Sequence, residues 1–153
     1  EMPLSYTTLY TGLSNLLNSE VPGYKGNPQD VFEAADWWGA LAEEYSLGIT
    51  YPSTKVAQAK AKFISEFSQI SPVSMNGLTQ LPKSFQEFSI VFASGITLGP
   101  AIPPPAPPII YPSTILIQAG ESIDKVCSVL ALEIHVWFKT GIVNINNVPN
   151  PWN

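Results

Sequence analysis

Apolar residues recur every three or four positions in five segments of this 153-residue chain, and no other feature limits its fold so strongly. This spacing places apolar side chains along one face of an α-helix, and that face has to pack against another element. The predicted helices cover residues 5–18, 28–46, 53–70, 84–98 and 114–139. We therefore predict a mainly α-helical protein of about five helices, and the chain length favours a single domain over residues 1–153.

Polar residues that commonly cap helices stand at the beginning of four of the predicted helices. They are Ser5 in the first, Asn27 just before the second, Ser53 or Thr54 in the third and Ser84 in the fourth. Their side-chain oxygens can accept hydrogen bonds from the free backbone N–H groups of the first helical turn. We therefore expect these helices to begin immediately after the capping residues.

Prolines gather between the fourth and fifth predicted helices, where residues 100–112 hold seven of the fifteen prolines in the chain. Proline lacks a backbone N–H and fixes its φ angle, so this segment is expected to be extended, as in polyproline II. Two interpretations stay open. The segment is either a ligand for an aromatic groove on a partner or a stiff strap across the chain's own surface.

The last predicted helix is followed by residues 141–153, and Gly141 is expected to stop the helix. Residues 143–146 are expected to add a short strand to another element. The prolines that follow predict an irregular tail over residues 148–153. Trp152 lies in this tail and needs a pocket for its large apolar ring.

An offset of 60 residues aligns the chain with itself. Residues 51–59 and 111–119 then agree at six of nine positions, and both segments begin with Tyr-Pro-Ser-Thr. Self-similarity at a fixed offset indicates repeated structural units. The match predicts an internal repeat of residues 22–70 and 82–130, in which each unit is a helical hairpin and the two hairpins pack as a bundle.

The composition excludes several classes of function. Only 12% of the residues are charged, the net charge is −5, and all seven basic residues are lysines. Proteins that bind nucleic acid carry a basic patch, which this sequence lacks, so no nucleic-acid partner is expected. The longest apolar tract, residues 126–138, is well short of the ~20 residues that span a bilayer, so no membrane span is expected.

Residues that carry enzyme chemistry are few. Cys127 and His135 are the only cysteine and histidine. Eight residues of helix separate them by about 12 Å along the axis, so they do not form a nucleophile pair, and the chain cannot form a common zinc site alone. The carboxylates of Glu43 and Glu44 fall on the polar face of a predicted helix, which is typical of solvent exposure. We expect no enzyme activity, no cofactor and no metal.

The last predicted helix is apolar on two faces, because Val129, Leu132 and Val136 project from the side opposite its core stripe. Exposure of such side chains is unfavourable, so we expect another chain to cover them together with part of the Pro-rich segment. The predicted interface residues are Val129, Leu132, Val136, Ile102, Pro104, Pro105 and Trp152. In the competing interpretation, the helix at residues 5–18 or the C-terminal tail covers this face from within the chain.

Two sequence features characterise the second half of the chain. A Phe-rich helix at residues 85–96 runs into the Pro-rich apolar segment, and the sequence Ile-His-Val-Trp-Phe-Lys-Thr-Gly at 134–141 precedes a tail with Pro and Trp. Over residues 84–153 the chain resembles the small virion structural proteins of tailed bacteriophages. The resemblance implies contacts instead of a catalytic site, a place in the virion, and other virion proteins or further copies of the chain as partners.

Two functions from different classes are therefore expected. In the first, the chain is a non-enzymatic structural subunit of a large assembly, above all a phage virion, and acts through apolar protein–protein contacts. In the alternative, it is a soluble, cytoplasmic helical-bundle binding module. This module would hold an apolar small ligand between Trp37, Trp38 and the Phe-rich helix.

Overall fold

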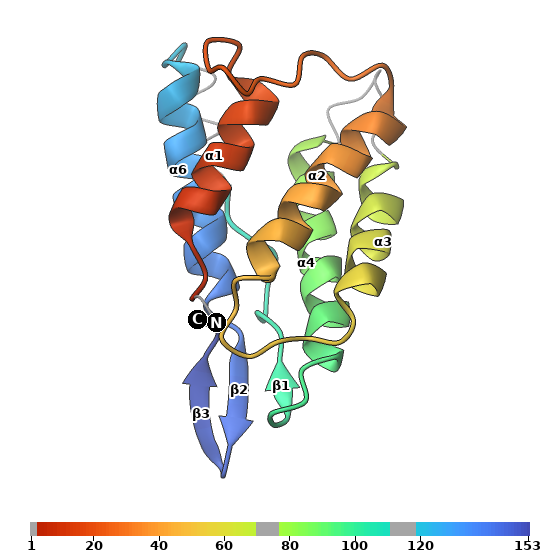
Figure 1. Cartoon of the computed structure of the whole chain (residues 1–153), viewed down its shortest axis with the longest axis vertical. Coiled ribbons are helices and arrows are strands. Elements are labelled where there is room, and N and C mark those ends of the chain that lie inside the picture. Colours follow the sequence, from red (N-terminus) through yellow and green to blue (C-terminus); the bar gives the residue numbers. More distant parts are fainter. Residues whose placement is uncertain (1–2, 70–76, 111–118) are drawn as a thin grey trace.

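The computed structural model describes residues 3–69, 77–110 and 119–153, and it is mainly α-helical as predicted. Within these residues two groups of helices stand side by side, α1 with α6 and α2 with α3 and α4 (Figure 1). A small antiparallel sheet in the order β1–β2–β3 projects from one end of the helices. The elements are α1 (Tyr6–Leu17), α2 (Val31–Ser46), α3 (Val56–Phe67), α4 (Gly77–Ser94), β1 (Ala101–Ile102), α6 (Ile123–Phe138), β2 (Ile142–Ile145) and β3 (Val148–Pro151).

The N-terminal caps of α1 and α2 are both made by side chains. Ser5 caps α1 as predicted, because its side chain accepts a hydrogen bond from the backbone N–H of Thr8. For α2 the prediction of Asn27 is wrong, since the helix begins at Val31 and Asp30 accepts from the N–H of Glu33 at 2.9 Å. The carboxylate of Glu33 in turn accepts from a backbone N–H that precedes the helix. This reciprocal pair satisfies two free donors at once, which a cap at Asn27 does not.

Neither Ser53 nor Thr54 caps α3, which begins at Val56. The hydroxyl of Ser53 instead donates to the carbonyl of Phe92 at 2.7 Å, and the N–H of Thr54 donates to the carbonyl of Gly95 at 2.9 Å. These bonds tie the turn before α3 to the end of α4. The Ser53 hydroxyl also accepts from the N–H of Lys55, the residue just before α3, but neither Ser53 nor Thr54 bonds an N–H within the first turn of the helix.

The expected start of the fourth helix is also wrong. Ser84 lies inside α4, where its side chain is buried and its hydroxyl donates to the carbonyl of Gln80 at 2.7 Å. The helix begins at Gly77 and contains Pro82. A serine hydroxyl can serve either a cap or the carbonyl four residues before it, so the residue type alone does not distinguish the two positions.

The prediction of an irregular tail is wrong for residues 148–151, which form β3 and pair antiparallel with β2. Asn146 and Asn147 have φ angles of 53° and 65° and make a two-residue hairpin turn of the kind that favours asparagine. The N–H of Trp152 donates to the carbonyl of Gly141 at 2.8 Å. In this register the nitrogens of Pro149 and Pro151 face away from β2, where proline costs no ladder hydrogen bond. The short strand expected at 143–146 is confirmed as β2.

Trp152 fills the centre of the core, and the predicted pocket for its ring lies within the chain. Its ring is fully buried, with centroids 4.8 Å from Phe138 and 5.5 Å from Phe92. Gly141 does not cap α6 with a left-handed residue, and a Cβ there would collide with the indole ring. Gly141 is therefore required for the close approach of Trp152 to the backbone.

The internal repeat stays a prediction. The second Tyr-Pro-Ser-Thr segment, at residues 111–114, and the expected beginning of the last helix both fall outside the described residues. The described part of the last helix is α6, which is capped by Ser122 and packs along α1.

We predict that Gly141→Ala destabilises the protein by about 1–3 kcal/mol, the usual cost of forcing an extra carbon into a packed core. The added methyl group would collide with the Trp152 ring, which is buried in contact with Phe92 and Phe138. Urea unfolding measures the loss. Gly23→Ala is the matched control, because the nearest neighbour of its new Cβ is the movable side chain of Asn15. Equal stability of the two variants would contradict the prediction.

Candidate interaction groove on helix α6

Helix α6 buries one face and exposes the other. Its buried residues are Val126, Cys127, Leu130, Ala131, Ile134, Trp137 and Phe138. On the outward face Val129 is half-buried, whereas Leu132 and Val136 keep 53% and 57% of their surface exposed. Neither α1 nor the C-terminal tail covers these two side chains, so the competing intramolecular interpretation is not supported.

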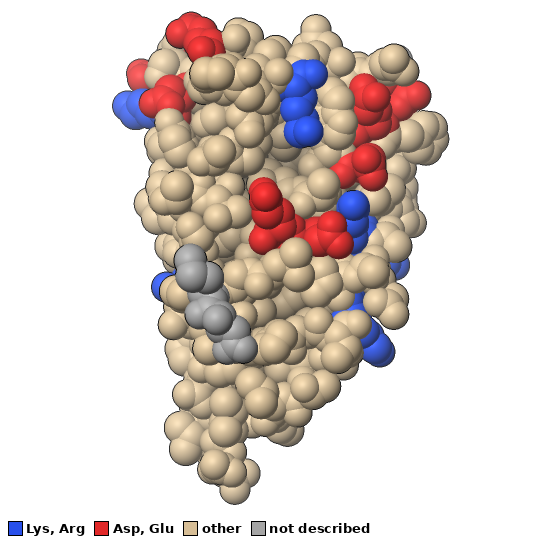
Figure 2. All heavy atoms as spheres, viewed as in Figure 1, with Lys and Arg blue, Asp and Glu red and all other residues tan. Residues whose placement is uncertain are grey.

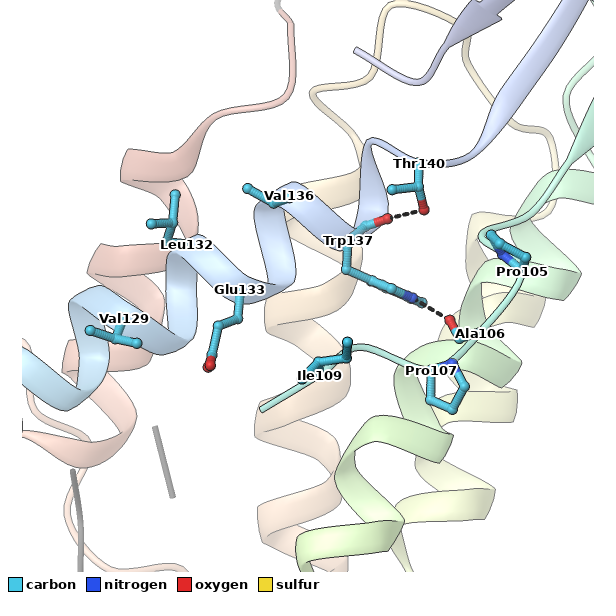
Figure 3. Close-up of a pocket in the computed structure, with 10 residues that line it drawn as sticks. All are labelled: Pro105, Ala106, Pro107, Ile109, Val129, Leu132, Glu133, Val136, Trp137 and Thr140. Atoms are coloured by element: carbon cyan, nitrogen blue, oxygen red, sulfur yellow. Dashed lines mark hydrogen bonds between the residues drawn. The ribbon is translucent and has the colours of Figure 1, made fainter. Parts of the chain in front are cut away.

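The outward face of α6 forms one wall of an apolar groove of about 580 Å³. The opposite wall is the described part of the Pro-rich segment, in which the side chain of Ile109 is 75% exposed (Figure 3). Glu133 and Thr140 supply the polar side chains of the lining. The groove is lined by Pro105, Ala106, Pro107, Ile109, Val129, Leu132, Glu133, Val136, Trp137 and Thr140.

A hydrogen bond and two buried prolines hold the wall of this groove in place. The indole Nε1–H of Trp137 donates to the carbonyl of Ala106 at 2.5 Å (Figure 3). Pro104 and Pro108 are buried on either side of this contact. Proline has few backbone conformations to lose, so the segment that carries Pro105 and Pro107 is stiff. The groove is therefore a preformed feature of the chain.

The structure places the predicted interface residues in three different environments. Val129, Leu132, Val136 and Pro105 lie together in the groove. Ile102 is exposed on β1, outside the groove lining. Pro104 and Trp152 were expected at an interface with another chain, and this is wrong because both are buried within their own chain.

Sequence reasoning missed several residues of the lining. Pro107 and Ile109 belong to the predicted Pro-rich segment but were not singled out. Ile109 did carry a signal, because it follows a run of prolines and belongs to no helical repeat that would place it in the core. Glu133 and Thr140 gave no signal, because Glu133 lies on the border between the two faces of α6 and Thr140 follows the end of this helix.

Charge is absent from the parts of the sequence that flank the groove. Residues 88–120 and 140–153 contain no Asp, Glu, Lys or Arg. Figure 2 shows the result on one face of the molecule, where charged side chains lie over the helices and the projecting end of the sheet carries none. Among the residues that line the groove, Glu133 is the only charged one.

The single histidine faces the interior between helices. The Nδ1 atom of His135 lies 2.7 Å from the hydroxyl of Tyr45, so this pair links α6 to α2. Burial raises the pKa of Tyr45. Burial, and to a smaller extent the nearby charge of Lys139, lower the pKa of His135.

Cys127 is buried against α1, and burial raises the pKa of its thiol, so it is not an activated nucleophile. The described residues contain no cluster of side chains suited to a metal ion.

The ligand pocket expected between Trp37, Trp38 and the Phe-rich helix is not formed. Trp38 stacks on Phe67 with a centroid distance of 6.0 Å, whereas Trp37 faces a different hollow, next to α1. The phenylalanines of α4, at positions 85, 88 and 92, are buried in the core. An apolar cavity is present elsewhere among the described residues, as the α6 groove.

No helix in the described ranges is long and apolar enough to cross a bilayer. Comparison with protein families, with curated proteins and with solved structures gave no match to this chain.

We predict that the stability of the fold falls as the pH drops from about 7 to 5, partly through His135. Because the folded-state pKa of His135 is lowered, the unfolded chain binds the proton more readily than the folded chain. The contribution of the neutral imidazole is complete above the unfolded pKa near 6.5 and is lost as the pH falls below it. Urea unfolding across this pH range measures the slope. His135→Gln should flatten it, and an unchanged slope in this variant would show that other groups cause the dependence.

We predict that Trp137→Phe loosens the groove wall without unfolding the protein. The variant loses the hydrogen bond to Ala106 and should cost about 0.5–1.5 kcal/mol from that bond, with a further loss from the smaller ring. Methyl NMR should detect a shifted and averaged signal of Ile109. Trp37→Phe is the control, since Trp37 lies outside the groove. An unaltered Ile109 signal in Trp137→Phe would mean that the prolines alone fix the wall.

Proposed function

We propose that this chain is a non-enzymatic structural subunit of a large assembly and that it binds its neighbours through apolar contacts. The observation that carries the proposal is the α6 groove. It is preformed, its lining is mostly apolar, and it exposes Leu132, Val136 and Ile109. Full burial of such a side chain contributes about 1.5–3 kcal/mol, so a partner that covers the three gains substantial free energy.

A second set of exposed apolar residues supports the same function. Leu98, Ile102 and Val148 lie in uncharged segments near the sheet and expose half or more of their surface. Covering these three side chains with a neighbouring subunit would remove further apolar surface from water, which is favourable. The low charge of the whole chain fits a subunit whose surface is largely covered by neighbours.

We further propose that the assembly is the virion of a tailed bacteriophage. This part of the proposal rests on the resemblance of residues 84–153 to the small virion structural proteins of tailed bacteriophages. The partners would then be other virion proteins or further copies of the same chain.

We predict that Leu132→Asp abolishes incorporation into the assembly. Leu132 is exposed in the single chain, so a carboxylate there leaves the fold intact and changes the unfolding free energy by no more than about 0.5 kcal/mol. In a closed interface the same carboxylate would be desolvated without a partner. Density-gradient sedimentation of particles from the source, followed by detection of the tagged chain, measures incorporation.

Phe32→Asp provides the matched control, because Phe32 is exposed on α2 and lies outside the groove lining. The control should sediment with the particles as the wild type does. Incorporation of Leu132→Asp at wild-type levels would contradict the proposed interface. Unfolding of Leu132→Asp would contradict the exposure on which the proposal depends.

An apolar small ligand is the second candidate for the groove. Its volume of about 580 Å³ falls within the range of ligand pockets, about 300–1,000 Å³. Native mass spectrometry of the purified protein distinguishes the two functions. A bound apolar molecule that disappears in Leu132→Asp favours the binding module, whereas an unliganded chain that sediments with particles favours the structural subunit.

A further inference from the structure

A hollow between α1 and α2 forms a second candidate site, separate from the α6 groove. It consists of two adjoining cavities of about 320 Å³ each, and both are lined by Gly12, Asn15 and Glu44. The two helices approach each other closely at this point, because a Cβ on Gly12 would collide with Leu41. The side chains on either side of Gly12 therefore determine what the hollow can bind.

One side of the hollow presents a row of polar groups. Thr8, Thr11 and Asn15 are three and four residues apart on α1, so they share one helix face, and Glu44 joins them from α2. The side chains of these four residues make no hydrogen bond or ion pair with any described residue. The neighbouring Glu43, by contrast, pairs with a lysine of α3. The row thus offers hydroxyl, amide and carboxylate groups that are free to bind a ligand.

The other side of the hollow is apolar and contains an aromatic ring. Leu16, Trp37, Ala40 and Leu41 line the cavity nearer the end of α1. The ammonium group of Lys25 lies 5.6 Å from the centre of the Trp37 ring. An aromatic face that attracts a cation also attracts polarised C–H groups, because both interact with the electron-rich face of the ring.

We propose that this hollow binds a short, neutral saccharide. A sugar ring combines a face of C–H groups, which fits Trp37, with hydroxyl groups at its edge. These hydroxyl groups can donate to Glu44, accept from the amide of Asn15 and exchange hydrogen bonds with the two threonines. Two adjoining cavities that share part of their lining suit a chain of sugar rings. An apolar ligand would leave the polar row without partners, which is unfavourable.

An anionic ligand fits the hollow less well than a neutral one. Lys25 is the only basic residue of the lining, Glu44 opposes it, and the whole chain carries a net charge of −5. The long Lys25 side chain is exposed, so it can move aside when a sugar stacks on Trp37. Lys25→Ala should therefore retain saccharide binding within about threefold, because a neutral ligand makes no ion pair there.

The test uses the folded 153-residue chain and a printed glycan array, followed by isothermal titration with the trisaccharides of glucose, N-acetylglucosamine and galactose and with any array hit. We expect binding of at least one saccharide. Trp37→Ala and Glu44→Gln should each weaken it about tenfold or more, the effect of losing a contact worth about 1.4 kcal/mol. Glu43→Gln is the matched control and should bind as the wild type does, since Glu43 is outside the hollow. Thermal unfolding confirms that each variant is folded.

Three outcomes would overturn the proposal. The first is the absence of binding to every array glycan and trisaccharide at millimolar concentration, and the second is binding that survives both Trp37→Ala and Glu44→Gln. The third is loss of binding in Lys25→Ala, which would identify an anionic ligand. Leu132→Asp should bind the saccharide normally, so this test and the test of the α6 groove can fail independently.

Discussion

The burial of Trp152 against Phe92 and Phe138 is the contact on which the rest of the architecture depends. These three rings bring together the C-terminal tail, α4 and α6, which are far apart in the sequence. Because the tail must return to the core, β3 is drawn against β2, and the carbonyl of Gly141 receives the N–H of Trp152. Aromatic pairs at these distances contribute free energy beyond their buried area. This aromatic cluster therefore fixes both the β2–β3 hairpin and the path of the chain after the end of α6.

The groove is a consequence of the same arrangement. α6 is apolar on both faces, and α1 and the aromatic cluster cover only the inner one. The outer face remains open beside residues 103–109 of the Pro-rich segment, which follow β1 and form no strand, because five of these seven residues are prolines without a backbone N–H. Trp137 connects the two, with its ring on the core side and its Nε1–H on the carbonyl of Ala106. A helix that would be fully buried in a larger protein thus becomes one wall of a binding surface.

The two surfaces proposed as sites differ in their chemistry as well as their position. The α6 groove is mostly apolar and has one charged residue in its lining, which suits another apolar surface. The hollow between α1 and α2 presents hydroxyl, amide and carboxylate groups beside an indole ring, which suits a polar ligand with C–H faces. A structural subunit with a separate saccharide site would combine assembly through one side of the bundle with recognition through another.

The sequence by itself determined the helical class, the cap at Ser5, the strand near Val143 and the exposed apolar face of α6, because each depends on local periodicity or a local hydrogen bond. The position of Ser84 inside α4 and the burial of Trp152 were decided only by the tertiary structure. A serine satisfies a cap or a carbonyl of its own helix with the same hydroxyl, and the choice depends on where the helix begins. The partner wall of the groove also required the fold, since the contact between Trp137 and Ala106 joins residues that no local pattern relates. Packing between distant segments selects among local alternatives that are similar in free energy, and this selection is absent from the spacing of residues along the chain.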